Sequence, residues 1–369
     1  MKGRAALYYG PEKGFQIQEL PTPEVEPGGV LVRVTAASVC GSDLHYWRRG
    51  MPPERLPRIT GHEFCGRVHT LGQGVTTDSL RRPLKEGDRV AFPFIFPCMR
   101  CYHCVRGELN VCQYRYRRNL RYRFEDYPYC DGGFAEYFYL PPGHFVFKVP
   151  DELPDEAVAP VNCALAQVTF ALDQVGVRPD DTVAIQGAGG LGIYAAAVAR
   201  QMGAGRVISI DAYQARLDLA LRCGATDVVN ISQLPEPEDR VQAVREMTGG
   251  IGVDLVVEVA GVPAAFQEGL AMVRKGGTYV TIGNIPARSV DLPLSSLITG
   301  QQRIVGVAHY NPWVILAALD FLVQTRDRYA LLDVVSQTYP LERINDAFRA
   351  ADWSGRGQDF SAARTVVKP

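Results

Sequence analysis

The spacing of apolar residues divides the chain into segments of two kinds. In the first 150 residues, short β-type runs at 30–35, 89–92 and 145–149 alternate with turns rich in Gly and Pro. This pattern predicts an irregular β domain. From residue 155 to about 175 the apolar positions recur at helical spacing, and roughly from 305 to 369 the segments are again mixed.

After residue 180 apolar strands alternate with helices. Strands that are apolar on both faces indicate a parallel sheet covered by helices on both sides. The predicted strands are residues 182–186, 206–211, 227–230, 254–259 and 278–282. The predicted helices between them are residues 191–202 and 214–223. The fold class is therefore α/β, with a doubly wound parallel sheet beside an irregular β domain.

Length and composition narrow the class of protein. A chain of 369 residues is too long for one compact core, so two domains are expected. With a net charge of −1, the chain has no global field that would attract nucleic acid or an anionic membrane. The N-terminus does not resemble a secretory signal, and no run of about 18 apolar residues is present. We expect a cytoplasmic protein with no membrane or nucleic-acid partner.

A glycine motif follows the strand predicted at 182–186. Residues 187–192 read GAGGLG, which has the spacing G-x-G-x-x-G. Such glycines allow a tight turn, a close approach of a pyrophosphate and packing of the next helix, whose N-terminus attracts phosphate. The predicted cofactor-binding residues here are Gly187, Gly189, Gly190, Leu191 and Gly192.

An acidic residue ends the following strand. The carboxylate of Asp211 is expected to accept hydrogen bonds from the adenosine ribose, and its charge would repel a 2′-phosphate, which favours NAD over NADP. Arg216 comes shortly afterwards. It either flanks the same ribose or lies on a solvated helix face.

Four of the nine cysteines lie within fifteen residues. They are Cys98, Cys101, Cys104 and Cys112. Four thiolates at this spacing can close a tetrahedral Zn²⁺ site with no open position, which is a structural zinc site. Such a site would crosslink a lobe that has little core of its own.

A second set of potential ligands is spread along the chain: Cys40, His62 and Cys163. Two thiolates and one imidazole form a known catalytic zinc set that leaves one position for substrate. From the residues alone, His62 can also be a satisfied core histidine, and Cys163 can be a small buried helix residue.

The order of these motifs resembles the medium-chain zinc-dependent alcohol dehydrogenases over nearly the whole chain. The resemblance rests on CGSDLH at residues 40–45, GHE at 61–63, the four-cysteine lobe and GAGGLG. It implies a GroES-like catalytic domain formed by residues 1–163 with 305–369. A Rossmann domain, residues 164–304, would be inserted between them, with the active site in the cleft.

The resemblance also implies roles for single residues. Cys40, His62 and Cys163 match the catalytic zinc ligands, and Ser42 matches the hydroxyl that takes the proton from the alcohol. His45 matches the outer end of that proton relay.

Further matches surround the ligands. Asp43 matches the carboxylate that orients a ligand imidazole, and Glu63 matches a glutamate behind the zinc. Arg364 matches the arginine that pairs with the cofactor pyrophosphate. The chain departs from many members at Gly41, where they carry Arg or His that helps to hold this pyrophosphate.

Together these matches imply an enzyme that moves a hydride between an alcohol and NAD, giving an aldehyde or ketone. Two zinc ions per chain, a small-molecule substrate and a homodimer or homotetramer are expected. One alternative is a zinc-free reductase of enones or quinones on the same fold, which would have no use for the three ligands. Another is a non-catalytic nucleotide-binding protein, which would not need Ser42 and His45.

The segment 113–129 departs from a plain alcohol dehydrogenase. It contains five Arg and five Tyr. It can be a solvated lobe or a subunit contact, or a rim that selects an anionic or polyhydroxylated substrate. A nucleic-acid contact is a third interpretation, although the near-zero net charge provides no wider basic surface for it.

Overall fold

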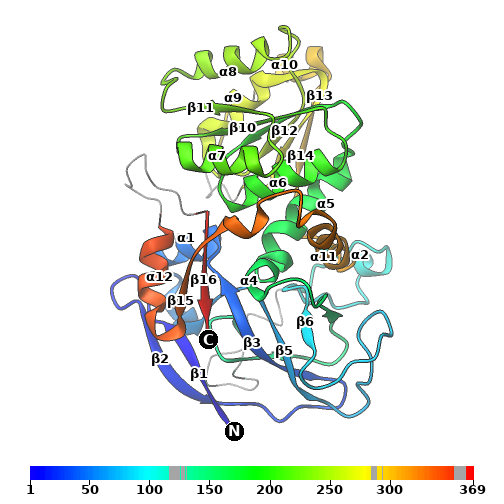
Figure 1. Cartoon of the computed structure of the whole chain (residues 1–369), viewed down its shortest axis with the longest axis vertical. Coiled ribbons are helices and arrows are strands. Elements are labelled where there is room, and N and C mark those ends of the chain that lie inside the picture. The colour runs from blue at the N-terminus through cyan, green and yellow to red at the C-terminus, as the bar shows by residue number, and fades with distance from the viewer. Residues whose placement is uncertain (116–124, 126–128, 130, 284–288, 293, 353–362) are drawn as a thin grey trace.

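The computed structural model describes residues 1–115, 125, 129, 131–283, 289–292, 294–352 and 363–369. Two halves are stacked along the long axis of the molecule (Figure 1). The upper half in this view holds the parallel sheet and its helices, and the lower half holds the remaining sheets and both chain termini. None of the helices in the described ranges has the length and apolar character needed to cross a bilayer.

The lower half is built on two sheets with an irregular connection pattern. Its N-terminal strands are β1 (Lys2–Tyr8), β2 (Phe15–Pro21), β3 (Val30–Ser38), β4 (Arg58–Ile59), β5 (Glu63–Leu71), β6 (Arg89–Ala91), β7 (Tyr137–Leu140) and β8 (Phe147–Lys148). The short helices are α1 (Gly41–Arg49), α2 (Tyr102–Val105) and α4 (Asp155–Val158), with 3₁₀ turns at Pro53–Arg55 and Leu109–Val111. The smaller sheet has the order β2-β1-β4.

The C-terminal segment completes the larger sheet. Its elements are α11 (Val314–Thr325), β15 (Val335–Pro340), α12 (Ile344–Ala351) and β16 (Arg364–Lys368), with 3₁₀ turns at Leu331–Val334 and Leu341–Arg343. The strand order is β15-β16-β3-β5-β6-β8, and β7 also pairs with β3. Val366 and Val367 of β16 pair antiparallel with Ser38 and Ala37 of β3. The two ends of the chain therefore form one sheet.

The upper half is a six-stranded parallel sheet with the order β11-β10-β9-β12-β13-β14. Its strands are β9 (Thr182–Gln186), β10 (Arg206–Asp211), β11 (Asp227–Asn230), β12 (Val253–Glu258), β13 (Val273–Thr281) and β14 (Arg303–Gly306). The helices of this region are α5 (Ala166–Val175), α6 (Gly190–Gln201), α7 (Gln214–Arg222), α8 (Pro237–Glu246), α9 (Pro263–Met272) and α10 (Leu294–Gly300). The α/β fold class predicted from the sequence is confirmed.

The helical pattern predicted from 155 to about 175 is interrupted. After α4, a π-helical turn at Val161–Leu165 precedes α5. Pro160 has no N–H to donate to an α-helix, and its ring crowds the preceding turn. The wider π turn presents Cys163 on a fully buried segment. Wide turns of this type are frequent at functional sites.

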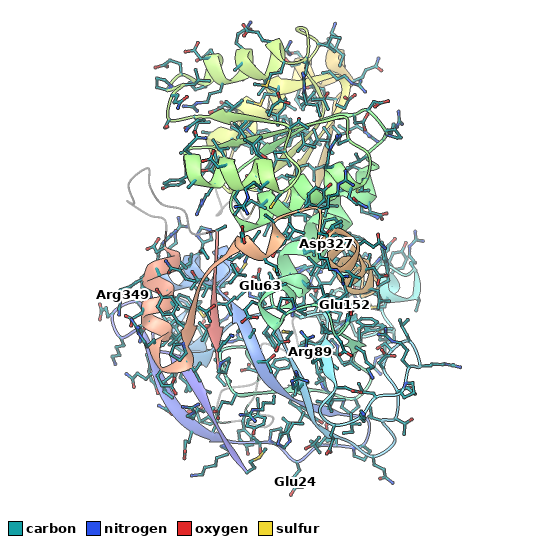
Figure 2. All side chains as sticks on the ribbon, viewed as in Figure 1. Glu24, Glu63, Arg89, Glu152, Asp327 and Arg349 are labelled. Atoms are coloured by element: carbon teal, nitrogen blue, oxygen red, sulfur yellow. The ribbon has the colours of Figure 1, made fainter. Side chains whose placement is uncertain are left out.

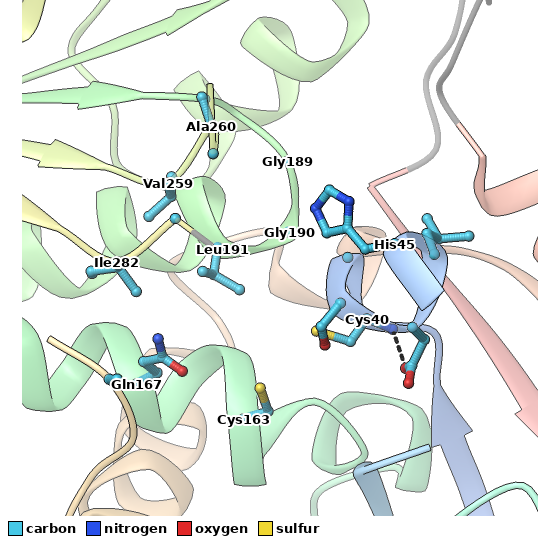
Figure 3. A pocket seen from close by; sticks show the side chains of 18 of the residues that line it. Cys40, His45, Cys163, Gln167, Gly189, Gly190, Leu191, Val259, Ala260 and Ile282 are labelled. Carbon is cyan, nitrogen blue, oxygen red and sulfur yellow. Dashed lines mark hydrogen bonds between the residues drawn. The ribbon is translucent and has the colours of Figure 1, made fainter. Parts of the chain in front are cut away.

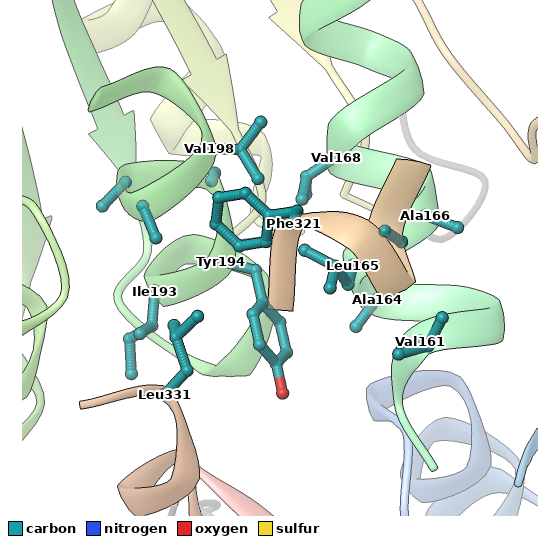
Figure 4. Close-up of a cluster of buried hydrophobic side chains, with 14 of the residues drawn as sticks. Val161, Ala164, Leu165, Ala166, Val168, Ile193, Tyr194, Val198, Phe321 and Leu331 are labelled. Carbon is teal, nitrogen blue, oxygen red and sulfur yellow. The ribbon is translucent and has the colours of Figure 1, made fainter. Parts of the chain in front are cut away.

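One hydrophobic cluster crosses the junction between the halves (Figure 4). Val161 and Leu165 of the π turn pack in the same cluster as Tyr194 of α6 and Phe321 of α11. Fully burying a side chain of this size contributes roughly 1.5–3 kcal/mol. The cluster therefore fixes the π turn against the parallel sheet.

We propose one adjustment of the expected domain limits. The limit between 304 and 305 lies inside β14, whose four residues pair with Thr278–Thr281 of β13. A division of a chain falls where few contacts cross it. The C-terminal limit of the Rossmann domain is therefore better placed after Gly306.

Candidate active site

A cleft of about 1770 Å³ lies between the two halves. Residues of α1, the π turn and β16 line it from one side, and the glycine motif and the ends of β10, β12 and β13 line it from the other. Ligands of open α/β sheets bind at the carboxyl ends of the strands, which is where this cleft lies. Figure 3 shows Cys40, His45 and Cys163 facing Leu191 and Ile282 across it.

The side chains of Cys40, His62, Glu63 and Cys163 converge beside this cleft. Each offers a ligand atom, and these atoms all lie within 4.8 Å of one another. Cys40 precedes α1, His62 precedes β5, and Cys163 comes from the π turn. A hydrogen bond from Cys163 lowers the pKa of the Cys40 thiol. Residues separated by more than one hundred positions thus form one donor set.

Asp43 contacts two members of this set. Its Oδ2 accepts a hydrogen bond of 3.0 Å from the backbone N–H of Cys40, and its Oδ1 lies 3.6 Å from Nδ1 of His62. The carboxylate is 5% exposed. A carboxylate behind a ligand imidazole fixes the ring orientation and directs the other nitrogen toward the ion site.

Glu63 lies deep inside the molecule at the junction, unlike Glu24 and Arg349 at its periphery (Figure 2). Its Oε2 accepts a hydrogen bond of 2.5 Å from Nη1 of Arg364, whereas Oε1 is buried without a hydrogen-bond partner among the described residues. Burial raises the pKa of Glu63 to about 8, and the charge of Arg364 acts in the opposite direction. The unsatisfied oxygen points to a missing partner at this site.

Arg364 connects the donor set to the glycine motif. Its guanidinium binds Glu63 and lies 3.5 Å from the backbone oxygen of Val39. Its side chain also packs on Gly190, where an added Cβ would lie 2.2 Å from Nε of Arg364. Arg364 lines the cleft beside the start of α6.

The glycine motif has the turn that its spacing predicts. Gly187 has a φ of 104°, which is the left-handed region that favours glycine. A Cβ on Gly192 would lie 1.7 Å from the carbonyl oxygen of Gly187, so only glycine fits there. The first turn of α6 therefore lies directly against the end of β9, with its N-terminal N–H groups toward the cleft.

Asp211 fastens this turn to the neighbouring strand. Its Oδ2 accepts a 2.7 Å hydrogen bond from the N–H of Ala188, and Oδ1 accepts one of 3.0 Å from Tyr213. The guanidinium of Arg216 lies 5.0 Å from the ring centre of Tyr213 and is buried, so the solvated alternative for Arg216 is wrong. Asp211 and Arg216 both line the cleft.

Ser42 and His45 lie three residues apart on α1 and both line the cleft. Residues three apart share one face of a helix. Burial lowers the pKa of His45, and the charges of Arg48 and Arg49 lower it further. The imidazole is therefore mainly neutral at pH 7.

The four-cysteine lobe forms its own small cluster. The ligand atoms of Cys98, Cys101, Cys104 and Cys112 all lie within 4.8 Å of one another. The backbone N–H of Cys98 also donates to Sγ of Cys112 over 3.3 Å. Four sulfurs this close and mostly buried match the donor set of a closed tetrahedral zinc site.

The sequence did not identify three other residues that line the cleft, namely Phe94, Asp131 and His309; the ring centre of Phe94 lies 5.0 Å from that of His62. Each stands alone in the sequence, without a spacing that marks a site. Most of the segment 113–129 lies outside the described residues, so its three interpretations stay open. Its described residue Arg115 lines the cleft.

Comparisons with known proteins agree with this geometry. Residues 26–151 match the family described as alcohol dehydrogenase GroES-like domain, and residues 190–324 match the family described as zinc-binding dehydrogenase. The 5-exo-hydroxycamphor dehydrogenase of Pseudomonas putida is 35% identical over 89% of this chain and 90% of its own. The sorbitol dehydrogenase of Bacillus subtilis is 32% identical over 91% and 90%.

Solved structures show the same fold. The alcohol dehydrogenase of Thermotoga maritima aligns over 100% of both chains with a TM-score of 0.88 and 26% identity. That of Thermus sp. ATN1 covers 99% of both chains, with a TM-score of 0.82 and 30% identity. A structure from Sinorhizobium meliloti, bound to NADP, aligns over 100% of both chains with a TM-score of 0.82 and 28% identity. The chain belongs to the zinc-dependent medium-chain alcohol dehydrogenase family.

Proposed function

We propose that this protein is a zinc-dependent dehydrogenase that moves a hydride between an alcohol and NAD, giving an aldehyde or ketone. The observation that carries this proposal is the convergence of Cys40, His62 and Cys163 beside the cleft that the glycine motif lines. The alcohol, sorbitol and hydroxycamphor dehydrogenases among its relatives support primary, secondary or polyol alcohols as the substrate class.

The donor set fits a catalytic zinc ion. Two thiols and an imidazole are the ligands that zinc prefers, and three protein ligands leave one position for substrate. Glu63 adds a further buried oxygen, Oε1, and its lack of a hydrogen-bond partner among the described residues agrees with an ion nearby. Cys98, Cys101, Cys104 and Cys112 would hold a second, structural ion. We therefore propose two zinc ions per chain.

The cofactor would bind at the glycine motif. The N–H groups at the start of α6 and the guanidinium of Arg364 would hold the pyrophosphate, with Gly190 and Leu191 beside it. Asp211 would accept hydrogen bonds from the ribose, and its charge disfavours a 2′-phosphate. Arg216 beside it favours such a phosphate, so the preference for NAD rests on Asp211.

Side chains of the protein would transfer the proton that the alcohol loses in the reaction. Oxidation removes a hydride and a proton from the alcohol. When bound, zinc would polarise the substrate oxygen and NAD would accept the hydride. Ser42 would take the hydroxyl proton while its own moves toward His45, and neutral His45 would release it to solvent. Asp43 would keep His62 oriented throughout.

The two alternative functions are disfavoured. A zinc-free reductase of enones or quinones would not need a buried set of two thiols and an imidazole at the cleft. A non-catalytic nucleotide-binding protein would not need Ser42 and His45 on the face of α1 that lines the cleft. A cytoplasmic location stays a prediction from the sequence, and a homodimer or homotetramer stays a prediction from the family.

A zinc measurement joined to an activity screen tests the proposal. The full chain is tested with NAD and with NADP against primary alcohols, secondary alcohols, polyols and phosphorylated alcohols, and its zinc content is determined on the same sample. We expect two zinc ions per chain and formation of NADH. His62→Ala and Cys163→Ala should each keep one zinc ion and lose turnover, because the catalytic ion is lost.

Cys223→Ala is the matched control, because Cys223 is a buried thiol that belongs to neither cysteine group. It should keep both zinc ions and wild-type turnover. Full turnover of His62→Ala, or one zinc ion per chain in the wild-type protein, would overturn the assignment of the catalytic site.

A further inference from the structure

We propose that the side-chain amide of Gln167 binds the carboxamide group of the nicotinamide ring and thereby fixes this ring beside the donor set. This inference rests on the proposed dehydrogenase function. It assigns a contact for the reactive end of the cofactor, which the glycine motif does not hold.

Gln167 lies on the face of α5 that lines the cleft. In the segment formed by the π turn and α5, the residues that line the cleft are Cys163, Gln167, Phe170 and Gln174. Intervals of four, three and four residues place side chains on one face of a helix. Gln167 therefore follows Cys163 by one turn on the same face, and a molecule that reaches its amide lies next to the donor set.

The wall around Gln167 is largely apolar. Its side chain projects from α5 toward the side of the cleft that holds Leu191 and Ile282 (Figure 3). Val168 of α5 and Ile282 belong to one hydrophobic cluster, and Leu191 and Val259 pack against it. Leu191, Val259 and Ile282 all line the cleft. A flat aromatic ring fits between walls of this kind, because ligand pockets bury rings against apolar side chains.

The amide of Gln167 is available to a ligand. Its side chain is half-buried, and it has no hydrogen-bond partner within the part of the chain that the structure describes. A side-chain amide offers an acceptor oxygen and two N–H donors. A carboxamide offers the same groups in return, so the two can exchange two hydrogen bonds. Such bonds are stronger in an apolar surrounding than in water.

Nicotinamide combines the two properties that this wall selects, an aromatic ring and an amide. Hydride transfer requires the ring to lie in contact with the substrate at the ion site. Gln167 is one helical turn from Cys163, which is a proposed ligand of that ion. Its amide is therefore in the position to set the place of the ring, whereas the first turn of α6 and Arg364 would hold only the pyrophosphate.

Calorimetric titration of the full chain with NAD and with ADP-ribose tests this assignment, because ADP-ribose lacks only the nicotinamide. Gln167→Leu should raise the Kd of NAD by about five- to tenfold and leave that of ADP-ribose within about twofold. The 3-acetylpyridine analogue of NAD has no amide N–H groups. It should bind the wild-type protein more weakly than NAD does, and Gln167→Leu should reduce this difference.

Gln174→Leu is the matched control. Gln174 lies on the same face of α5, but it is exposed and its Nε2 donates to Oδ2 of Asp173 over 3.4 Å. This variant should bind both molecules as the wild type does. An unchanged Kd of NAD in Gln167→Leu, even if the KM of a polyol substrate rises, would overturn the inference alone. Equal losses of NAD and ADP-ribose in this variant would do the same. A wild-type protein that binds neither molecule would instead overturn the proposed function.

Discussion

His45 is the residue whose charge state most directly limits the proposed proton transfer. The imidazole is half-buried, and burial lowers its pKa; Arg48 and Arg49 lower it further, while Cys40 acts in the opposite direction. Only the neutral ring can accept a proton. The rate of alcohol oxidation should therefore fall as the pH drops through a value below 6.5, the ordinary pKa of histidine.

His45→Ala should lower kcat by about a hundredfold at pH 7 and remove this acidic limb from the pH profile. His69→Ala serves as the control, because His69 contacts Thr70 and Tyr137 and lies outside the cleft. Retention of the acidic limb in His45→Ala would show that another group receives the proton.

Among single residues, the sequence predicts those whose spacing reflects a physical requirement. Cys98 to Cys112 and Gly187 to Gly192 form local patterns, and the structure brings each of them together as predicted. Cys40, His62 and Cys163 could be joined only through the resemblance to a family. His309 and Phe94 could not be predicted, because their neighbours at the cleft are set by tertiary packing.

Among the elements, the turn between β9 and α6 depends most strictly on single residues. Gly192→Ala would place a Cβ 1.7 Å from the oxygen of Gly187. The strand and helix must then separate, and we expect the free energy of unfolding to fall by about 3 kcal/mol or more. Denaturation in urea, followed by circular dichroism, measures this loss.

Gly189→Ala tests the same turn without the clash. Among the described residues, an added Cβ there would come within 4 Å only of Nη1 of Arg216, at 4.0 Å. We expect stability close to that of the wild type and an NAD Kd raised about tenfold, since the methyl group occupies space next to the pyrophosphate. A large loss of stability in this variant, or none in Gly192→Ala, would contradict the assigned geometry.

The prediction of elements was most accurate for three neighbouring strands on one side of the parallel sheet. The predicted bounds 182–186, 206–211 and 227–230 coincide with β9, β10 and β11. The strand predicted at 278–282 instead begins at Val273, because a register shift between β12 and β13 extends the pairing beyond the apolar run. Local periodicity does not contain such pairing information.

For the whole molecule, the four-cysteine lobe should contribute to stability without affecting nucleotide binding. Cys101, Cys104 and Cys112 form a small buried cluster of their own, separate from the main core. Cys101→Ser combined with Cys112→Ser should remove one zinc ion and lower the Tm by several degrees, because the lobe loses its crosslink. Calorimetry and zinc analysis measure both effects.

NAD binding should persist in this variant, because the glycine motif lies in the other half of the molecule. Unchanged zinc content in the double variant would show that the lobe holds no ion. The sequence could not predict how the lobe meets the cleft, since the contact between Asn110 and Asn311 joins residues 201 positions apart.

The position of β16 between β15 and β3 in the larger sheet affects how this protein is made. During translation β3 is synthesised before the whole parallel-sheet half, whereas its neighbour β16 is synthesised after it. Until then one edge of the N-terminal sheet stays open to pairing with other nascent chains. Termination of translation before Arg364 would therefore remove β16 and Arg364 together, leaving β3 without its neighbouring strand rather than giving a slightly shortened enzyme.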